Sequence, residues 1–543
     1  MTQEAHPPTP RYNMPLLWLI CMVAALGGLL FGYDWVVIGG AKAFYEPFFG
    51  ITSAPFLQGF AMSTALVGCI FGAVLSGGLS DRVGRKRLLI LSGLLFTVSA
   101  VWTALAADFV TFNIARVLGG LGIGLASNLS PMYIAEISPA SMRGRFVSIN
   151  QLTIVIGVLA AQIVNWMIAA PMPSVDDIRL LLDERSAELV AAKDPDLDFT
   201  EIKQQANLHV EEEALSAVAA KFPSLDYAPL ADDATKEQKQ ARADEDIAIT
   251  TAYIESTWNG VRGWRWMFGA EFVPAFAFFF LMFFMPESPR WLVKNGQCEQ
   301  AQRILRWVGG PEYAAAEVSD IAATISREEV AHVRFSDLVE PKLMKIIGLG
   351  VFLAVFQQWC GINVIFNYAQ EVFRAAGYDV GELMFSILIT GIVNLVFTFI
   401  AIFTVDRLGR RPLMLIGAAG LAGIYAVLGT GYYLQTTGVF MLVLVVSAIA
   451  CYSMSLAPIT WVVISEIFPN RIRGAAMSLA VSSLWIGCTA LTFTFPILNR
   501  AVGAHGVFWL YGAICVFGFA VIYLKLPETK GKSLEEIERE LVD

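Results

Sequence analysis

Four amide side chains interrupt an apolar stretch that begins near Ile346. An amide both donates and accepts hydrogen bonds, so a group of amides suits the adjacent hydroxyls of a hydroxyl-rich ligand. In hydrocarbon an amide is costly without a partner, so these side chains should face a bundle interior or a watery cavity. The alternative is that they only join neighbouring helices, as many membrane amides do. They are Gln357, Gln358, Asn363 and Asn367, with Gly361 between them as a possible bend.

Two ionisable residues lie inside other apolar runs, Asp34 in the first and Arg116 in the fourth. A single charge in a membrane is expensive, so we expect the two side chains to pair. A carboxylate beside a guanidinium stays ionised, whereas an isolated buried carboxylate favours its protonated form. A conformational change that separates the pair would therefore let Asp34 take up a proton. The alternative is a permanent structural ion pair.

The composition is that of a membrane protein. The chain has 543 residues, of which 56% are hydrophobic and 16% charged, and its mean hydropathy is +0.59. A soluble chain would carry about 25% charged residues. The seven cysteines show no paired spacing and the four histidines form no cluster, so we expect neither disulfides nor a metal site. No nucleophile–base pair stands out, so we expect neither an enzyme nor a cofactor, and no cleavable signal peptide is predicted.

Twelve apolar stretches have the length of membrane-spanning helices, which need about 20 residues each. The chain is therefore predicted to be an all-α membrane protein. The stretches are 15–38, 56–79, 88–107, 112–135, 146–169, 264–285, 344–370, 382–404, 413–433, 438–463, 475–499 and 505–526.

Basic residues mark one side of the membrane. The connections after spans two, four, six, eight and ten carry arginine and lysine, which the positive-inside rule assigns to the cytoplasm. Both termini fall on that side. The segment 171–262, after span five, contains 20 acidic and 9 basic residues and falls on the opposite side.

The chain repeats itself. SDRVGRKR at Ser80 is echoed by VDRLGRRP at Val405, and AEISPASMRGR at Ala135 by SEIFPNRIRGA at Ser465. PESPRW at Pro286 is echoed by PETKGK at Pro527, but at an offset shorter by 84 to 89 residues. The first half therefore contains an insertion of about that length, which is the acidic segment. Two parallel halves of six spans are expected, with a site between them at the midplane.

This organisation predicts seven parts. They are an N-terminal tail at 1–14, helices one to five at 15–170, an acidic extracytoplasmic insertion of amphipathic helices at 171–262, helix six at 263–285, cytoplasmic linker helices at 286–343, helices seven to twelve at 344–526, and a cytoplasmic tail at 527–543. The insertion is either a solvated decoration or a lid or partner-binding element.

The set of motifs resembles the sugar porter family of the major facilitator superfamily, most closely its bacterial xylose–proton and hexose–proton symporters. The resemblance covers nearly the whole chain outside the insertion. The motifs include GGLLFGYD at 27–34, GGLSDRVGRKR at 77–87, PESPRWL at 286–292 and FQQWCGINVIFNYA at 356–369. It implies a monomeric transporter of the bacterial inner membrane that carries a monosaccharide together with protons by alternating access. No nucleic-acid partner is expected.

The resemblance also implies roles for individual residues. Asp34 and Arg116 match the positions implicated in proton coupling, and passive facilitators of the family typically lack the acid. Seven residues match sugar-binding or gating positions, namely Gln151, Gln357, Gln358, Asn363, Asn367, Trp461 and Trp485. A tryptophan offers a flat apolar face to the C–H surface of a sugar and one N–H donor.

Charged residues of the cytoplasmic motifs are implied to close that side of the transporter in one of its two states. The expected ion pairs are Asp81 with Arg85, Glu136 with Arg143 or Arg145, and Glu466 with Arg473, with Asp406 and Arg410 as the second-half equivalents of the first pair. Exposed pairs contribute only about 0–1 kcal/mol each, but a network made in one state can bias an equilibrium between two. The alternative is that these charges only fix the topology.

Three positions depart from the family pattern. Asn367 stands where an aromatic gate residue is usual, Leu484 where a polar residue usually precedes the tryptophan, and Leu456–Ala457 where small residues or an aromatic are usual. The particular sugar therefore stays open. A facilitator that needs no protons is the nearest alternative. A sugar receptor without transport is disfavoured, because the chain lacks a long cytoplasmic tail.

Overall fold

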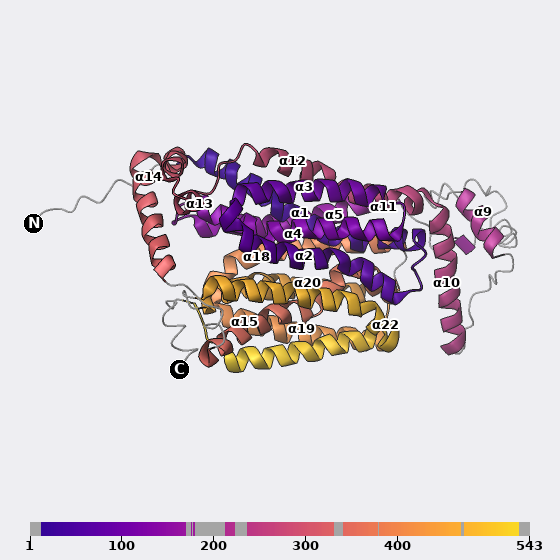
Figure 1. Ribbon diagram of the computed structural model, residues 1–543. Coiled ribbons are helices and arrows are strands. Elements are labelled where there is room, and N and C mark those ends of the chain that lie inside the picture. The colour runs from indigo at the N-terminus through magenta and orange to yellow at the C-terminus, as the bar shows by residue number, and fades with distance from the viewer. Residues whose placement is uncertain are drawn as a thin grey trace, which may run out of the picture.

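The computed structural model describes residues 12–169, 175, 178–179, 212–222, 236–330, 340–377, 380–468 and 472–530, and these contain helices and no strand. Two helical bundles lie side by side, one from each half of the chain (Figure 1). The N-terminal half comprises α1 (Met14–Phe48), α2 (Pro55–Val83), α3 (Arg85–Leu105), α4 (Phe109–Ile137), α5 (Arg143–Ile168), the π-helix η1 (Asn259–Gly263), α11 (Trp264–Gly269) and α12 (Phe272–Met282).

The C-terminal half follows the same plan with more interruptions. It comprises α15 (Pro341–Trp359), α16 (Ile362–Asn367), α17 (Ala369–Ala375), α18 (Val380–Leu408), α19 (Arg410–Tyr433), α20 (Val439–Met454), α21 (Leu456–Ile467) and α22 (Arg473–Lys525). The long α22 reverses direction at Gly503, where φ is 70° and ψ 168°, so it crosses twice. Eleven described segments are long and apolar enough to span a membrane, α22 among them. With its two arms counted separately, the predicted twelve crossings are confirmed.

The seventh crossing is broken into three helices because its residues cannot continue a single one. α15 ends at Trp359, and Gly361 takes the left-handed conformation with φ 87°. Tyr368 then separates α16 from α17. The predicted bend at Gly361 is thus confirmed. The tenth crossing is likewise interrupted at Ser455, where φ is −127° and ψ −86°, between α20 and α21. Irregular backbone at membrane depth occurs in proteins where it lines a buried site.

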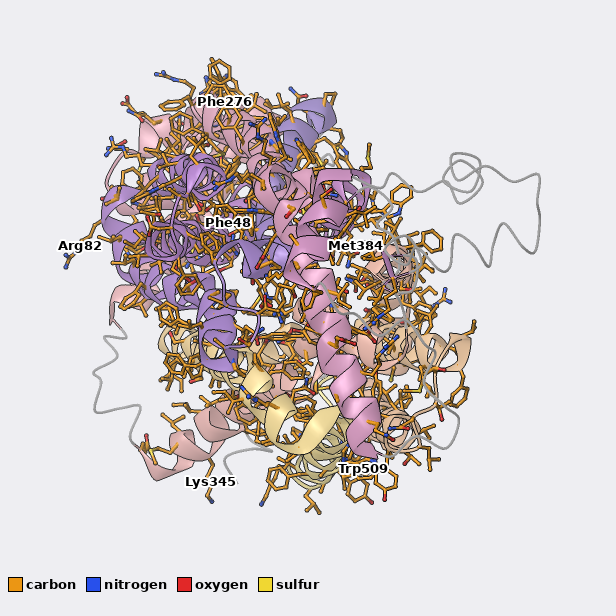
Figure 2. All side chains as sticks on the ribbon, turned by 90° about the vertical axis from the view of Figure 1, so that its right-hand side faces the viewer. Phe48, Arg82, Phe276, Lys345, Met384 and Trp509 are labelled. Carbon is orange, nitrogen blue, oxygen red and sulfur yellow. The ribbon has the colours of Figure 1, made fainter. Side chains whose placement is uncertain are left out.

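The acidic insertion contributes two described helices, α9 (Glu212–Lys221) and α10 (Lys236–Ser256). They confirm helices within the predicted insertion, and another stretch for which an amphipathic helix is expected, LLDERSAELVAAKD at 181–194, lies outside the described residues. Buried Val218, Ile249 and Tyr253 belong to a small separate core, and Arg179 pairs with Asp246 at 2.6 Å. Figure 2 shows α10 running across this end of the bundles.

At the other end, α13 (Pro289–Lys294) and α14 (Cys298–Val330) form the predicted linker helices, with α14 kinked at Gly310. Burial raises the pKa of the Glu317 carboxyl on α14. We call this the linker end, and the end that carries α9 and α10 the insertion end. The two halves meet where α2 packs on α22, where α5 packs on α18, and where α1 packs on α16 and α17.

Replacing Gly361 with alanine should lower stability by about 2 kcal/mol, because an L-residue is strained at this φ and the new Cβ would lie 2.7 Å from the Tyr511 ring. Gly348→Ala is the matched control: it lies on α15 of the same crossing, and no atom lies within 4 Å of its added Cβ. Thermal unfolding in detergent should show a lower Tm for Gly361→Ala alone. Equal Tm values for the two variants would contradict this account of the break.

Candidate functional site

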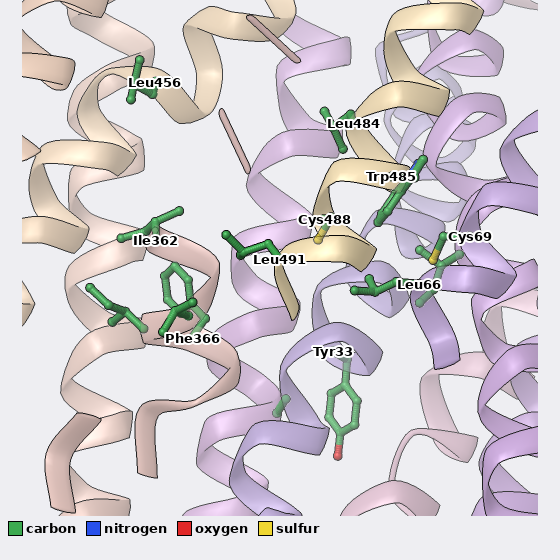
Figure 3. Packing of buried hydrophobic residues seen from close by; sticks show 14 of the residues in the cluster. Tyr33, Leu66, Cys69, Ile362, Phe366, Leu456, Leu484, Trp485, Cys488 and Leu491 are labelled. Atoms are coloured by element: carbon green, nitrogen blue, oxygen red, sulfur yellow. The ribbon is translucent and has the colours of Figure 1, made fainter. Parts of the chain in front are cut away.

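A small closed cavity lies between the halves, midway along α1. It offers only about 10 Å³ to the centre of a water molecule, roughly the room for one water. Figure 3 shows the packing around it, with Trp485 beside Leu66 and Cys69. Helices from both halves line the cavity: Phe31, Trp35 and Ile38 on α1, Met62, Ala65, Leu66 and Cys69 on α2, Arg116 and Ile123 on α4, Asn367 on α16 and Trp485 on α22.

Aromatic rings from both halves form its apolar wall. The Phe31 ring lies 5.6 Å from Trp485 across the interface and 6.1 Å from Trp35 on its own helix. Trp35 in turn lies 6.4 Å from Phe366 of the C-terminal half. Such rings present flat apolar faces, which suit the C–H surface of a ligand that is polar at its edges.

Four polar atoms on the cavity-lining residues are buried and have no hydrogen-bond partner among the described residues. They are Oδ1 of Asn367, Nε1 of Trp485, Nε1 of Trp35 and Nε of Arg116. Buried polar groups are nearly always hydrogen-bonded in native proteins. One acceptor and three donors around an aromatic cavity are therefore the groups that a small polar ligand would use.

The other predicted amides of the seventh crossing form a chain beside the cavity. Nε2 of Gln357 donates to the carbonyl of Ala457, in the first turn of α21, at 3.0 Å. Nε2 of Gln358 donates to Oε1 of Gln357 at 3.2 Å, and Nδ2 of Asn363 donates to Oε1 of Gln358. Oδ1 of Asn363 has no partner within the described part of the chain. Asn363 and Asn367 are one turn apart on α16 and so share a face.

Two predicted sugar contacts lie away from the cavity. Gln151 on α5 and Trp461 on α21 are half-buried and do not line it. Gln162, about three turns beyond Gln151 on the same face of α5, was not predicted. It is buried, and its Nε2 donates to Oγ1 of Thr390 on α18 at 3.2 Å, across the interface. The feature of the sequence that could have identified Gln162 is an amide within the apolar stretch 146–169.

The predicted pairing of Asp34 with Arg116 is confirmed. Both residues are 1% exposed, and Nη1 of Arg116 donates to Oδ1 of Asp34. Nη2 donates to the Asp34 carbonyl at 3.1 Å, and the guanidinium lies over the Phe268 ring at 5.2 Å. Arg116 also lines the cavity, so the ion pair borders the site that Asn367 and Trp485 form.

A third charged group joins this pair, and the sequence analysis missed it. Glu271 at the start of α12 is 2% exposed and interacts electrostatically with both Asp34 and Arg116. The feature of the sequence that could have identified Glu271 is an acidic residue within the apolar stretch 264–285. Two acids thus face a single guanidinium in a dry interior, where an unbalanced charge is costly. A proton on one of the two acids would balance the cluster.

At the linker end the motif charges form a network, but partly with other partners than predicted. Arg85 pairs with Asp81 at 3.0 Å as expected. Glu136 pairs with Arg85 through two bonds of 3.0 Å each. The predicted pairing of Glu136 with Arg143 or Arg145 is therefore wrong for the described structure. Nε of Arg143 donates instead to the Ala135 carbonyl at 3.0 Å. The fork of Arg85 matches the carboxylate of Glu136 edge to edge, which is a strong arrangement.

In the second half, Arg410 pairs with Glu466 at 3.4 Å. The side chains of Asp406 and Arg473 lie outside the described part, so the predicted pair of Glu466 with Arg473 stays untested. The described linker-end ion pairs join helices of one half, or α13 to its own half through Lys294 and Asp81 at 2.7 Å. An ion pair that joins the two halves is present at the insertion end, between Lys42 and Glu371.

Proteins of known function resemble this chain over nearly its whole length. The family model described as "sugar (and other) transporter" matches residues 20–175 and 247–541, leaving 176–246 of the insertion outside. The chain is 34% identical to the D-xylose-proton symporter of Escherichia coli, over 97% of the chain and 96% of the relative. It is 33% identical to the arabinose-proton symporter of Bacillus subtilis, over 98% and 97%.

Solved structures of sugar transporters have the same fold over nearly the whole chain. The partially occluded inward-open conformation of the xylose transporter of E. coli matches with a TM-score of 0.72 at 32% identity, covering 96% of this chain and all of that one. The proton:xylose symporter bound to 6-bromo-6-deoxy-D-glucose matches with a TM-score of 0.70 at 33% identity, covering 98% and 100%.

Arg116→Gln should destabilise the protein strongly, because it leaves Asp34 and Glu271 buried without their cation. Breaking a buried pair in this way costs about 3–5 kcal/mol. Glu271→Gln is the matched variant, since it keeps the shape and leaves Asp34 paired with Arg116. Thermal unfolding in detergent at pH 8 should show a large fall in Tm for Arg116→Gln only. A fall as large for Glu271→Gln would contradict the charge balance described here.

Proposed function

The chain belongs to the sugar transporter family, the sugar porters of the major facilitator superfamily, and we propose that it takes up a monosaccharide together with protons by alternating access. The main support for this proposal is that the Asp34–Arg116 ion pair and the cavity adjoin each other. Arg116, which pairs with Asp34, lines the same cavity as Asn367 and Trp485. Symport requires that sugar binding and proton binding influence each other, and groups in contact provide such coupling directly.

In this proposal the sugar lies between the rings of Trp35, Phe31 and Trp485. The unpartnered atoms of Asn367, Trp485 and Trp35 bond its hydroxyls. Asn363 contributes its free Oδ1, while Gln357 and Gln358 hold Asn363 in place through their hydrogen-bonded chain. The cavity is too small for a monosaccharide as it stands, so the halves must part for the sugar to enter. Gln151 and Trp461 contact the sugar only after such a movement.

Asp34 carries the coupled proton in this proposal. When the halves rock and Arg116 moves away, Asp34 takes up a proton in this proposal, because a buried carboxylate without a partner favours its protonated form. Glu271 is a second acid that can share that proton, because it faces the same guanidinium. A facilitator would need no such group. The acid and its arginine therefore favour the symporter, as do the relatives named as proton symporters.

We place the protein in a bacterial inner membrane as a monomer, with the linker end and both termini in the cytoplasm and the insertion outside. The basic loops of the linker end support this orientation. Asp81, Arg85 and Glu136, and Arg410 with Glu466 in the second half, pair within each half in the described structure. In this proposal the same charged residues form the cytoplasmic gate between the halves when that side closes. Asp406, Arg143 and Arg473 belong to the same motifs and join that gate in the other state.

Asp34→Asn should abolish accumulation of sugar against its gradient and spare sugar exchange, because the amide cannot carry the proton but keeps the shape of the site. The measurement is uptake of labelled xylose, arabinose and glucose into proteoliposomes with and without an imposed pH gradient. Counterflow of the preferred sugar in the absence of a gradient is the internal control. Concentrative uptake by Asp34→Asn equal to that of the wild type would refute the role of Asp34.

Trp485→Phe should weaken binding of the preferred sugar about fivefold, because it removes one hydrogen-bond donor and keeps the aromatic face; a net hydrogen bond contributes roughly 0.5–1.5 kcal/mol. Trp509→Phe is the matched control, because Trp509 on the second arm of α22 is 41% exposed and does not line the cavity, and it should change Kd less than twofold. Isothermal calorimetry in detergent measures both. Equal losses for the two variants would remove Trp485 from the site.

A further inference from the structure

A buried group of charges joins the two halves at the insertion end. Lys42 near the end of α1 is 1% exposed, and its Nζ lies 3.5 Å from Oε1 of Glu46, one turn further along the same helix. The same Nζ contacts Oε1 of Glu371, which belongs to α17 of the other half. The side chain of Glu371 is 27% exposed, so it stands at the edge of this buried group.

The surroundings of Lys42 hold this arrangement in place. The ammonium lies 4.5 Å from the centre of the Tyr368 ring, an attractive cation–π distance. Tyr368 is itself fixed, because its hydroxyl donates to the Thr492 carbonyl at 2.5 Å. Nε2 of Gln58 on α2 donates to Oε2 of Glu46 at 3.0 Å, and Arg374 acts electrostatically on Glu46. Two cations and two acids, one of each from either half, thus balance one another.

Next to these charges the backbones of α1 and α16 approach each other closely. A Cβ added to Gly39 would lie 2.9 Å from the Phe366 carbonyl oxygen, so only glycine permits this contact. One residue later, the Gly40 carbonyl accepts a hydrogen bond from Nε2 of Gln370 at 3.1 Å. These contacts lie between the cavity, at Asn367, and the insertion end. The seam from Gly39 to Glu371 therefore closes the cavity toward that end.

The segment that carries Glu371 is built to move separately. α17 is only seven residues long and is set off from α16 by Tyr368, and α16 is set off from α15 by Gly361. A short helix that follows two such breaks can swing with small changes of backbone angles. When it swings away from α1, Lys42 loses Glu371 and keeps only Glu46 of its own helix.

We propose that Lys42 and Glu371 form an ionic latch that holds the insertion end closed and that must break before the cavity opens to that side. The inference deepens the proposed alternating access and rests on it. A contact made in only one of two states shifts their ratio by its full free energy. The latch therefore sets how often the cavity faces the insertion side, and it leaves the groups around the cavity unchanged.

A native cysteine can report on this opening. Cys69 lines the cavity and is 0% exposed, so an impermeant maleimide added on the insertion side reaches it only when that end opens. Glu371→Gln keeps the side-chain shape and leaves Lys42 paired with Glu46. In right-side-out vesicles without sugar, this variant should be alkylated at Cys69 at least tenfold faster than wild type, as mass spectrometry of the Cys69 peptide would show. Tenfold corresponds to a shift of about 1.4 kcal/mol.

Lys221→Met is the matched control, because it breaks a lysine ion pair with Glu255 between α9 and α10 that does not join the halves; its Cys69 rate should stay within twofold of wild type. Lys42→Met should accelerate alkylation like Glu371→Gln, and the double variant should add nothing to either, because both remove one interaction. Wild-type alkylation rates in Glu371→Gln, or additive effects in the double variant, would overturn the latch. The assay uses neither sugar nor protons, so a failure of the proposed function appears separately, as absent uptake by wild-type vesicles.

Discussion

The contact between Asp34 and Arg116 is the interaction on which the centre of this protein depends. A carboxylate and a guanidinium are each too costly to bury alone in an apolar bundle. Together they fix α1 against α4, and Gly119 keeps its backbone close to the Asp34 carboxylate because an added Cβ would lie 3.2 Å from Oδ2. Glu271 then adds an acid that the single cation cannot fully balance. In the proposed mechanism this makes the site sensitive to a proton, and its arginine forms part of the cavity wall.

The two ends of the bundle use charge differently. At the linker end, Arg85, Asp81 and Glu136 bind one another within one half, so the halves can separate there without breaking these pairs. At the insertion end, Lys42 and Glu371 bind across the interface, and Gly39 lets the backbones touch. The described structure is thus sealed toward the insertion. Alternating access requires such a seal on one side at a time.

Much of this was predictable, because hydrophobic length determines the spans and the cost of lone charges determines their pairing. The break at Gly361 followed from its place among amides, and the pair of Asp34 with Arg116 from their shared depth. The partner of Glu136 was mispredicted, because nearness in sequence favoured Arg143 while helix packing brought Arg85 closer. Trp35 and Glu271 were missed as single residues in apolar runs. Lys42 and Glu371 meet only through packing of distant helices, as do Gly40 and Gln370, 330 positions apart.

The most direct test of the central claim is whether sugar entry moves protons. Wild-type protein in lightly buffered proteoliposomes, with no imposed gradient and with valinomycin and potassium to prevent charge build-up, is given xylose, arabinose or glucose while the external pH is recorded. A coupled transporter makes the medium more alkaline as the transported sugar enters, and a protonophore abolishes the change. Entry of the sugar with no change in external pH would contradict the account and leave a facilitator in its place.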